Sequence, residues 1–312
     1  MRYFLAVILT TSFLFAQTDV QRPHVLGLAH VAIRVSDIGK SGVFYENVLG
    51  YAVPFSLKDS KGRIAIAFVK VNDQQYVELF RGDTQSRGQI DHFALYTDDL
   101  TGMREYLLAQ QVPLLEDIQK GRIGNPFLTV RDPGGHRIEI LQYSPGSLTA
   151  RSQGKFMPAG RISSHITHVG IPVSSMGPAI RFYQDILGFR ETSRTTNGGE
   201  EPDRVDLQAP DGSDSIELLS FAGSPLPPNV RGQSHFCLAT SNVRETVAML
   251  QSRAVSGLLM SPITVQTGDN LPTRANLSDP DGARIEIMEA GSAGASPIAS
   301  VLSVTGELVS HH

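Results

Sequence analysis

The chain has 312 residues, a length typical of two domains rather than one. Apolar residues make up 41%, enough for a sizeable core, which excludes disorder for most of the chain. The 27 basic and 31 acidic residues give a net charge of −4, without the basic excess of nucleic-acid binders, so we expect no nucleic-acid partner. One cysteine, Cys237, excludes an internal disulfide and a thiolate metal cluster.

Residues 1–16 (MRYFLAVILTTSFLFA) have the pattern of an export signal peptide. Arg2 provides a short basic region, an apolar run follows, and the bond after Ala16 is a plausible cleavage point, although Leu14 is not the small residue usual at the −3 position. The run is shorter than the roughly 20 apolar residues that a membrane span needs. We therefore expect an exported protein, periplasmic or secreted, with no stable membrane anchor after cleavage.

The rest of the chain is an internal repeat. Residues 29–51 and 167–189 align without gaps and are identical at ten of 23 positions. Residues 127–141 and 274–288 share seven of 15 positions. Similarity at two separate places, in the same order, indicates duplication of a whole unit.

This duplication predicts two domains, over residues 24–146 and 163–291. The stretch 144–164 is rich in Ser, Gly and Pro, which is typical of a linker, and we place the linker at residues 147–162. Residues 292–312 are mostly small and polar, and we expect a flexible C-terminal tail there.

Each half contains two copies of a smaller unit. A unit opens with a short alternating strand that contains a histidine, at 28–35, 90–97, 166–173 and 233–240. A helix is predicted after each opening strand; Ser36 and Asp37 precede the first, which ends at Gly50, and Asp98 precedes the second. Strands follow, and the last one carries a glutamate among apolar residues, at 75–80, 137–141, 215–220 and 284–288. The sequence therefore predicts an α+β fold built from four βαβββ modules.

The histidines and glutamates of these strands form two candidate metal sites. A glutamate between apolar neighbours on a strand faces the side opposite to them, which here is the concave side of a helix-covered sheet. A buried carboxylate there costs several kcal/mol unless it is paired or metal-bound. A lone histidine or glutamate is more often structural, but the fourfold recurrence of the pair favours a metal site. The residues are His30, Glu78, His92 and Glu139 in the first half, and His168, Glu217, His235 and Glu286 in the second.

Two motifs in each half carry a family resemblance. They are H-V-x-I-x-V followed by F-Y-x-x-x-L-G, and D-P-x-G-x-x-I-E, seen at His30, Phe44-Tyr45, Leu49-Gly50, Asp132-Pro133, Gly135 and Glu139, and again at His168, Phe182-Tyr183, Leu187-Gly188, Asp279-Pro280, Gly282 and Glu286. This pattern resembles the vicinal oxygen chelate superfamily, which includes glyoxalase I, type I extradiol dioxygenases and bleomycin-resistance proteins. The resemblance implies two tandem domains whose paired modules curl around a metal held by the two histidine and glutamate sets. The module pairing stays open, since family members pair modules in two ways.

The order His, Glu, His, Glu resembles glyoxalase I most closely. In that enzyme a metal stabilises an enediolate, and a glutamate beside it moves a proton between neighbouring carbons. The resemblance implies Glu139 or Glu286 as this catalytic residue, a divalent ion (Zn, Ni, Fe or Mn), and a small-molecule substrate that chelates the ion through neighbouring oxygens. Glutathione is mainly cytoplasmic, which argues against it as the substrate thiol of an exported protein. A monomer and a homodimer are both compatible with the sequence.

Two other functions have to be weighed. An Fe(II)-dependent extradiol-type dioxygenase would use two histidines and one carboxylate, such as His168, His235 and Glu286. Ring-cleaving dioxygenases carry a tyrosine three residues before D-P, where this chain has Thr129 and Asn276, which counts against ring cleavage. A non-catalytic binding protein of the bleomycin-resistance type generally lacks the metal ligands, and this chain retains both sets.

Two further residues lie near the predicted sites. Cys237 follows His235 by two positions and shares its face of the strand, where it would line the pocket or be a buried structural thiol, the commoner state. Lys120 lies in a segment that resembles a glyoxalase I loop. It could meet an anionic substrate group, although a solvated surface lysine is the commoner state.

Overall fold

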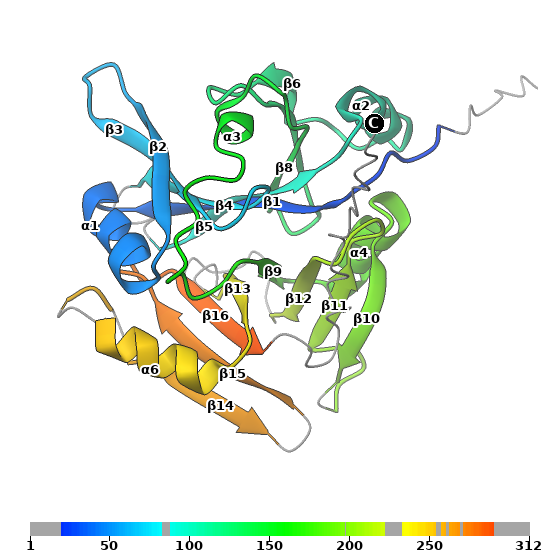
Figure 1. Ribbon diagram of the computed structural model, residues 1–312. Coiled ribbons are helices and arrows are strands. Elements are labelled where there is room, and N and C mark those ends of the chain that lie inside the picture. Colours follow the sequence, from blue (N-terminus) through cyan, green and yellow to red (C-terminus); the bar gives the residue numbers. More distant parts are fainter. Residues whose placement is uncertain are drawn as a thin grey trace, which may run out of the picture.

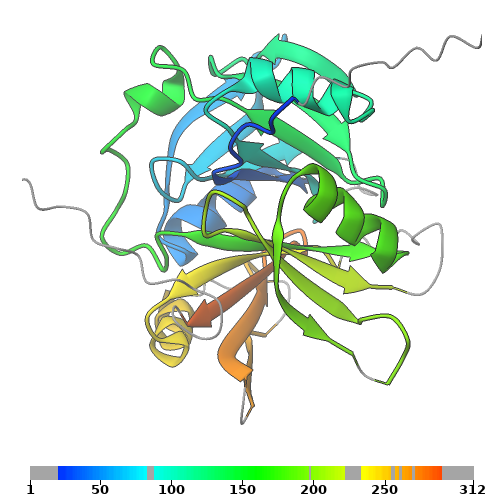
Figure 2. The ribbon, with the colours of Figure 1, turned by 90° about the vertical axis from the view of Figure 1, so that its right-hand side faces the viewer.

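The computed structural model in Figure 1 describes residues 20–82, 88–196, 198–221, 233–253, 257–259, 262–268 and 271–289. The predicted signal peptide and the predicted tail lie outside these residues. Each half forms one eight-stranded mixed sheet, and the two halves stack on each other, as the blue-to-green and green-to-red parts of Figure 2 show.

The first sheet has the strand order β2-β3-β4-β1-β5-β8-β7-β6. Its central strands, β1 and β5, are antiparallel, and each is followed outward by the parallel closing strand of its own module. The two modules of one half therefore pair with each other. The elements are β1 (Gly27–Val35), α1 (Ile38–Val43), the π-helical turn η1 (Phe44–Val48), β2 (Ala52–Lys58), β3 (Ile64–Lys70), β4 (Tyr76–Arg81), β5 (Ile90–Tyr96), α2 (Leu100–Ala109), β6 (Glu116–Lys120), β7 (Pro126–Arg131) and β8 (Arg137–Leu141).

The second sheet repeats this order as β10-β11-β12-β9-β13-β16-β15-β14. The prediction of four βαβββ modules is confirmed. The elements are β9 (Ile166–Val173), α4 (Met176–Arg181), the π-helical turn η2 (Phe182–Ile186), β10 (Arg190–Thr195), β11 (Arg204–Gln208), β12 (Ser215–Ser220), β13 (His235–Thr240), α6 (Val243–Arg253), β14 (Thr264–Gly268), β15 (Leu271–Ser278) and β16 (Arg284–Glu289). Among the described residues, none of the helices combines the length and the apolar character needed to cross a membrane.

Alternation along the strands separates the core from the concave face. In β1, Val31, Ile33 and Val35 point into an apolar core that also contains residues of the second half. His30 and Ala32 point to the opposite, concave face. The opening strand of each half therefore helps to build both the interface between the halves and its own candidate site.

The helix starts agree with the sequence in one case and differ in the other. Asp37 caps α1, since its side chain accepts hydrogen bonds from the amides of Gly39 and Lys40. The cap of α2 is Asp99, which accepts from the amide of Gly102, and not the expected Asp98. Asp98 instead lies 2.8 Å from His24 Nδ1. Where two acidic residues are adjacent, the local path of the chain decides which of them caps the helix.

A tyrosine contact joins the two halves. The Tyr183 hydroxyl on η2 donates to Asp132 Oδ2 in the first half at 3.1 Å, and both residues are buried. The equivalent pair on the other side of the pseudo-symmetric interface is Tyr45 on η1 and Asp279. There, neither the Tyr45 hydroxyl nor Asp279 Oδ2 has a hydrogen-bond partner among the described residues.

The predicted linker contains a short helix, α3 (Leu148–Arg151), which lies over the first half (Figure 1). Lys70, fully buried on β3, holds this segment through a hydrogen bond from Nζ to the Ser152 carbonyl at 2.5 Å. The same ammonium group donates to Asp73, in the turn after β3, at 2.6 Å. Asn125 donates to the Thr149 hydroxyl at 2.9 Å, again from inside the protein. The start of the linker is therefore fastened to the first domain.

Candidate metal centres

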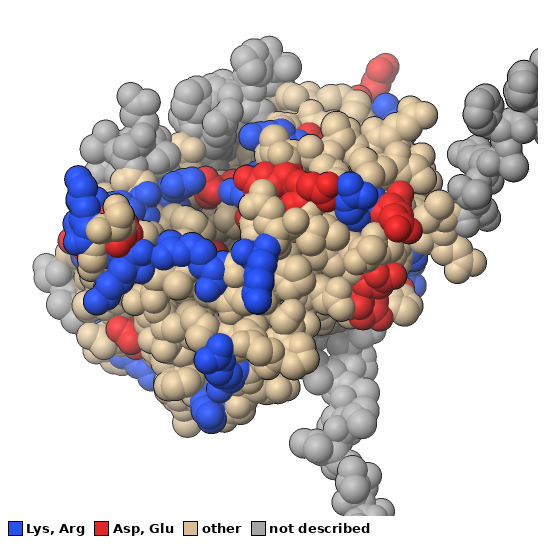
Figure 3. All heavy atoms as spheres, turned by 90° about the horizontal axis from the view of Figure 1, so that it is seen from above, with Lys and Arg blue, Asp and Glu red and all other residues tan. Residues whose placement is uncertain are grey.

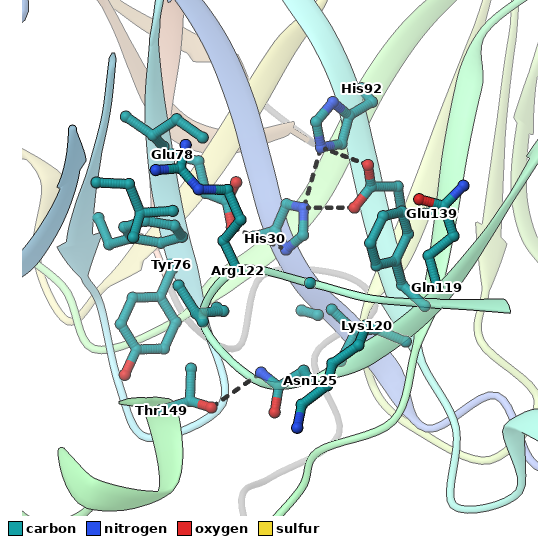
Figure 4. Close-up of a pocket in the computed structure, with 18 of the residues that line it drawn as sticks. His30, Tyr76, Glu78, His92, Gln119, Lys120, Arg122, Asn125, Glu139 and Thr149 are labelled. Carbon is teal, nitrogen blue, oxygen red and sulfur yellow. Dashed lines mark hydrogen bonds and ion pairs between the residues drawn. The ribbon is translucent and has the colours of Figure 1, made fainter. Parts of the chain in front are cut away.

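Strand register brings the predicted residues of the first half together. On antiparallel β1 and β5, His30 lies opposite Ala94, and His92 lies opposite Ala32. The two small residues leave space between the imidazole rings. Parallel β4 and β8 flank this centre and add one glutamate each. The four side chains converging on the concave face are His30, Glu78, His92 and Glu139, all buried (Figure 4).

The donor atoms of the first centre are close to one another. The Nε2 atoms of His30 and His92 are 3.1 Å apart, and Glu139 lies 3.6 Å and 3.4 Å from them. Glu78 lies 3.5 Å from His30 Nδ1. Ligand atoms of His30, Glu78 and His92 all fall within 4.8 Å of one another. This set could hold a divalent ion, with Glu139 beside it.

Neighbouring charges fix the orientation of these groups. Asp91 Oδ2 is 2.8 Å from His92 Nδ1. Because a carboxylate only accepts, Nδ1 carries the proton and Nε2 presents its lone pair to the centre. Asp91 is held in turn by Arg34 at 2.7 Å. Arg137 lies 3.0 Å from Glu139 and anchors that carboxylate.

Burial makes the uncharged forms favourable in the first centre. Burial, with His92 and Arg137 nearby, holds the pKa of His30 well below its usual value. Burial and the charge of Glu139 raise the pKa of Glu78 well above the normal range. The pKa of Glu139 is also raised by burial, although His92 and Arg137 oppose the shift. A neutral imidazole is the form that binds a metal ion.

A cavity of about 360 Å³ opens onto this centre. Its apolar wall includes Phe68, Phe80 and Phe127. Polar groups also line the cavity, including exposed Lys120 and Arg122 on the β6–β7 hairpin (Figure 4). In the view from above in Figure 3, lysine and arginine side chains flank a hollow, with acidic side chains along one edge. The cavity is large enough for a small organic molecule.

The second centre repeats the geometry. The Nε2 atoms of His168 and His235 are 3.3 Å apart. Glu286 lies 3.3 Å from His168, and Glu217 lies 3.1 Å from His235. All four residues are buried. The eight residues predicted from the sequence therefore form two compact clusters, one per half.

Charge distinguishes the second centre from the first. Arg204 lies 2.7 Å from Glu217, a contact without an equivalent at Glu78 among the described residues. Burial alone would lower the pKa of His168, but Cys237, Glu286 and Glu217 raise it to about 10. Against the effect of burial, hydrogen bonding and charge from His235 and the charge of His168 lower the pKa of Glu217 to about 2. The second centre thus favours ionised side chains.

The sequence match to known families covers both halves. The model of the Glyoxalase/Bleomycin resistance protein/Dioxygenase superfamily matches residues 27–140 and 165–287. The chain belongs to this superfamily.

Individual members of the superfamily resemble the chain to different extents. Lactoylglutathione lyase from Neisseria meningitidis serogroup A is 28% identical over 127 residues, which are 38% of this chain and 92% of that protein. Glyoxalase I from Saccharomyces cerevisiae is 22% identical over 69% of this chain and 68% of its own length. The 2,3-dioxygenase LapB from Pseudomonas sp. KL28 has the same fold, with a TM-score of 0.66, 16% identity, and coverage of 89% of this chain and 96% of that one.

The residues present fit the divalent metal that the superfamily typically uses. In the first centre, two carboxylates with raised pKa values face two histidine nitrogens inside the protein. In the second, Glu286 Oε1 is a buried oxygen without a hydrogen-bond partner among the described residues. A bound cation would stabilise buried, clustered donor atoms of this kind.

Three residues that position the first centre were not found from the sequence. Arg137 is two positions before Glu139, so strand alternation alone puts it on the same face. Asp91 directly precedes His92, where nothing in a single sequence separates an orienting carboxylate from a solvated one. Thr149 lies in the predicted linker, and its place in the cavity wall depends on contacts with Asn125 that only the fold reveals.

Proposed function

We propose that the first half is a metal-dependent, glyoxalase-like lyase or isomerase. The substrate would be a small molecule whose two neighbouring oxygens chelate the ion. The observation that carries this proposal is the cavity of about 360 Å³, which ends on the two-histidine, two-glutamate centre. A further expectation is that the substrate carries an anionic group, because Lys120 and Arg122 lie at the cavity and their charge favours such a group.

The proposed roles follow from the geometry. His30, His92 and Glu78 are the metal ligands, since their donor atoms form the compact group. A divalent ion bound there would supply Lewis-acid polarisation of a substrate carbonyl. Glu139 takes a proton from the carbon next to that carbonyl and returns it to the neighbouring carbon. Arg137 holds Glu139 in position and favours its ionised form.

Ring cleavage by the usual extradiol mechanism is not supported by the residues around the two centres. Thr129 is buried and donates to Glu116 at 3.2 Å, and Asn276 accepts from Arg284 at 2.7 Å. Neither has the phenol that a tyrosine would bring to this position. The likeness to LapB concerns the fold alone.

The place of action is a separate proposal. The signal-like residues 1–16 support export to the periplasm or the outside of the cell. In that compartment the substrate would not depend on glutathione. N-terminal sequencing of the protein recovered from the producing cells tests this point, since a chain that still begins at Met1 contradicts cleavage after Ala16.

The proposed reaction is tested by proton exchange, which needs no knowledge of the natural substrate. The chain, purified without chelator and analysed for bound metals, is incubated in D₂O with 2-oxoaldehyde–thiol adducts and small α-hydroxy carbonyl acids. Deuterium uptake at carbon is followed by NMR. We expect Glu139→Gln to abolish exchange with little loss of metal, and the matched variant Glu286→Gln to retain it. Full exchange in Glu139→Gln, or no divalent metal in the first half after reconstitution, would overturn the proposal.

A further inference from the structure

The two halves differ at the residue that faces the first histidine. In the first half, Ala94 on β5 lies opposite His30 and next to Glu139 on β8. In the second half, the same place on β13 is occupied by Cys237, which lies opposite His168 and next to Glu286 on β16. Register therefore inserts a thiol between a histidine and a glutamate, where the first half has a methyl group.

The thiol belongs to a compact donor cluster. Ligand atoms of His168, Cys237 and Glu286 all lie within 4.8 Å of one another, and the three side chains are buried. Cys237 is fully buried. Its contact with the Leu238 carbonyl is 3.9 Å long, so that carbonyl holds the sulfur only weakly.

A second observation at this cluster concerns the carboxylate of Glu286. Glu286 is 2% exposed, and its Oε1 atom has no hydrogen-bond partner among the described residues. The arginines near this oxygen, Arg274 and Arg284, are 3.6 Å and 3.9 Å away, beyond hydrogen-bonding distance. A buried carboxylate oxygen in this state gains from a ligated ion.

The position of His235 is also particular to the second half. It lies opposite Gly170, where the first half has Ala32 opposite His92. A Cβ atom at position 170 would be 2.0 Å from Cε1 of the His235 ring. The glycine therefore lets the imidazole lie against the backbone of β9, beside the cluster that contains the thiol.

We propose that the second half binds a thiophilic divalent cation, zinc or cobalt, with the Cys237 sulfur as a ligand beside His168 and Glu286. The first half offers only nitrogen and oxygen donors, and thiolate ligation shifts selectivity toward softer ions. On binding, the Cys237 thiol and the His168 imidazolium each release a proton to solvent. The two halves thus differ in metal preference. This inference goes beyond the function proposed for the first half and does not depend on it.

Cobalt(II) spectroscopy tests the thiol directly. The full chain is freed of metal and titrated with Co²⁺, and bound cobalt is measured alongside near-ultraviolet absorbance, where thiolate-to-cobalt charge transfer appears. The double variant His30→Ala/His92→Ala removes the first centre, so that the signal comes from the second half. Cys237→Ala copies the alanine of the first half, and Cys237→Ser keeps the size of the side chain. Circular dichroism checks that each variant is folded.

We expect the charge-transfer band in the parent chain and in the double variant, with displacement by Zn²⁺ but not by Mg²⁺. The band should vanish in Cys237→Ala and Cys237→Ser, and the zinc Kd of the second half should rise by more than about tenfold, since even an outer-shell partner is worth that much. Cobalt bound to the second half without the band overturns the proposal, as does a second half that binds no cobalt. Loss of exchange activity with the band intact would count only against the function proposed for the first half.

Discussion

The tyrosine pair between the halves offers a matched test of the interface. Removing the Tyr183 hydroxyl by Tyr183→Phe breaks a buried hydrogen bond to Asp132 Oδ2. A hydrogen bond to a charged group contributes about 1.5–3 kcal/mol. Asp132 keeps its contact with His136 at 2.9 Å, so we expect a loss near the lower end, about 1.5 kcal/mol.

The control is Tyr45→Phe at the pseudo-equivalent position. The Tyr45 hydroxyl is buried without a hydrogen-bond partner among the described residues. Its removal therefore eliminates the cost of burying an unpaired polar group. We expect no loss, or a gain of up to about 1 kcal/mol. Both variants remove the same atom from the same residue type on equivalent π-helical turns of the two halves, so the difference isolates the hydrogen bond.

Urea unfolding of the full chain, followed by circular dichroism, gives both values if the slope m is unchanged. We expect a clear gap between the two unfolding free energies. Variants that agree within about 0.5 kcal/mol, or a larger loss for Tyr45→Phe, would show that the hydroxyl contact does not stabilise the interface.

Three further outcomes are expected. Asp91→Asn should weaken metal binding by the first half about 10–100-fold, because His92 loses the carboxylate that fixes its tautomer; an unchanged metal Kd in a competition titration would contradict this. Burial raises the pKa of Asp279 to about 7, so its protonated form contributes stability that is full below pH 4 and lost as the pH rises toward 7. Asp279→Asn should therefore become more stable relative to the parent between pH 4 and 8, by up to about 4 kcal/mol, and unfolding free energies that change in parallel over that range would refute it. Gly170→Ala should displace His235 and lower the metal content of the second half alone, which elemental analysis measures.

The fold was predictable because its signals are local and repeated. Alternation around His30 and His168, together with the glycines that end the helices, defines the modules without any long-range information. The site residues followed for the same reason, since each lies on an alternating strand. The pairing of the modules did not follow, because whether β1 pairs with β5 or with a strand of the other half depends on packing energies that one sequence does not display.

The groups that set the charge and the pKa values of the two centres were harder to predict than the candidate ligands. Ala94 and Cys237 occupy equivalent positions, yet their importance depends on β-sheet register, which sets the residue opposite each histidine. The contrast in pKa shifts likewise depends on contacts made only in the fold, since His235 and His168, with Arg204 at the start of β11, surround Glu217. Which partner a long side chain such as that of arginine contacts depends on the three-dimensional fold and cannot be read from the sequence.

The attachment of the linker has a consequence for any division of the chain into its two halves. Thr149, which follows the last strand of the first sheet, closes part of the cavity wall, and buried Lys70 holds the same segment in place. A fragment ending at Leu141 would lack that wall and would leave a buried ammonium group without its carbonyl acceptor. The connection between the halves is therefore also part of the cavity wall of the first half. A fragment meant to carry a complete first cavity has to extend through Ser152, past the last strand of the sheet.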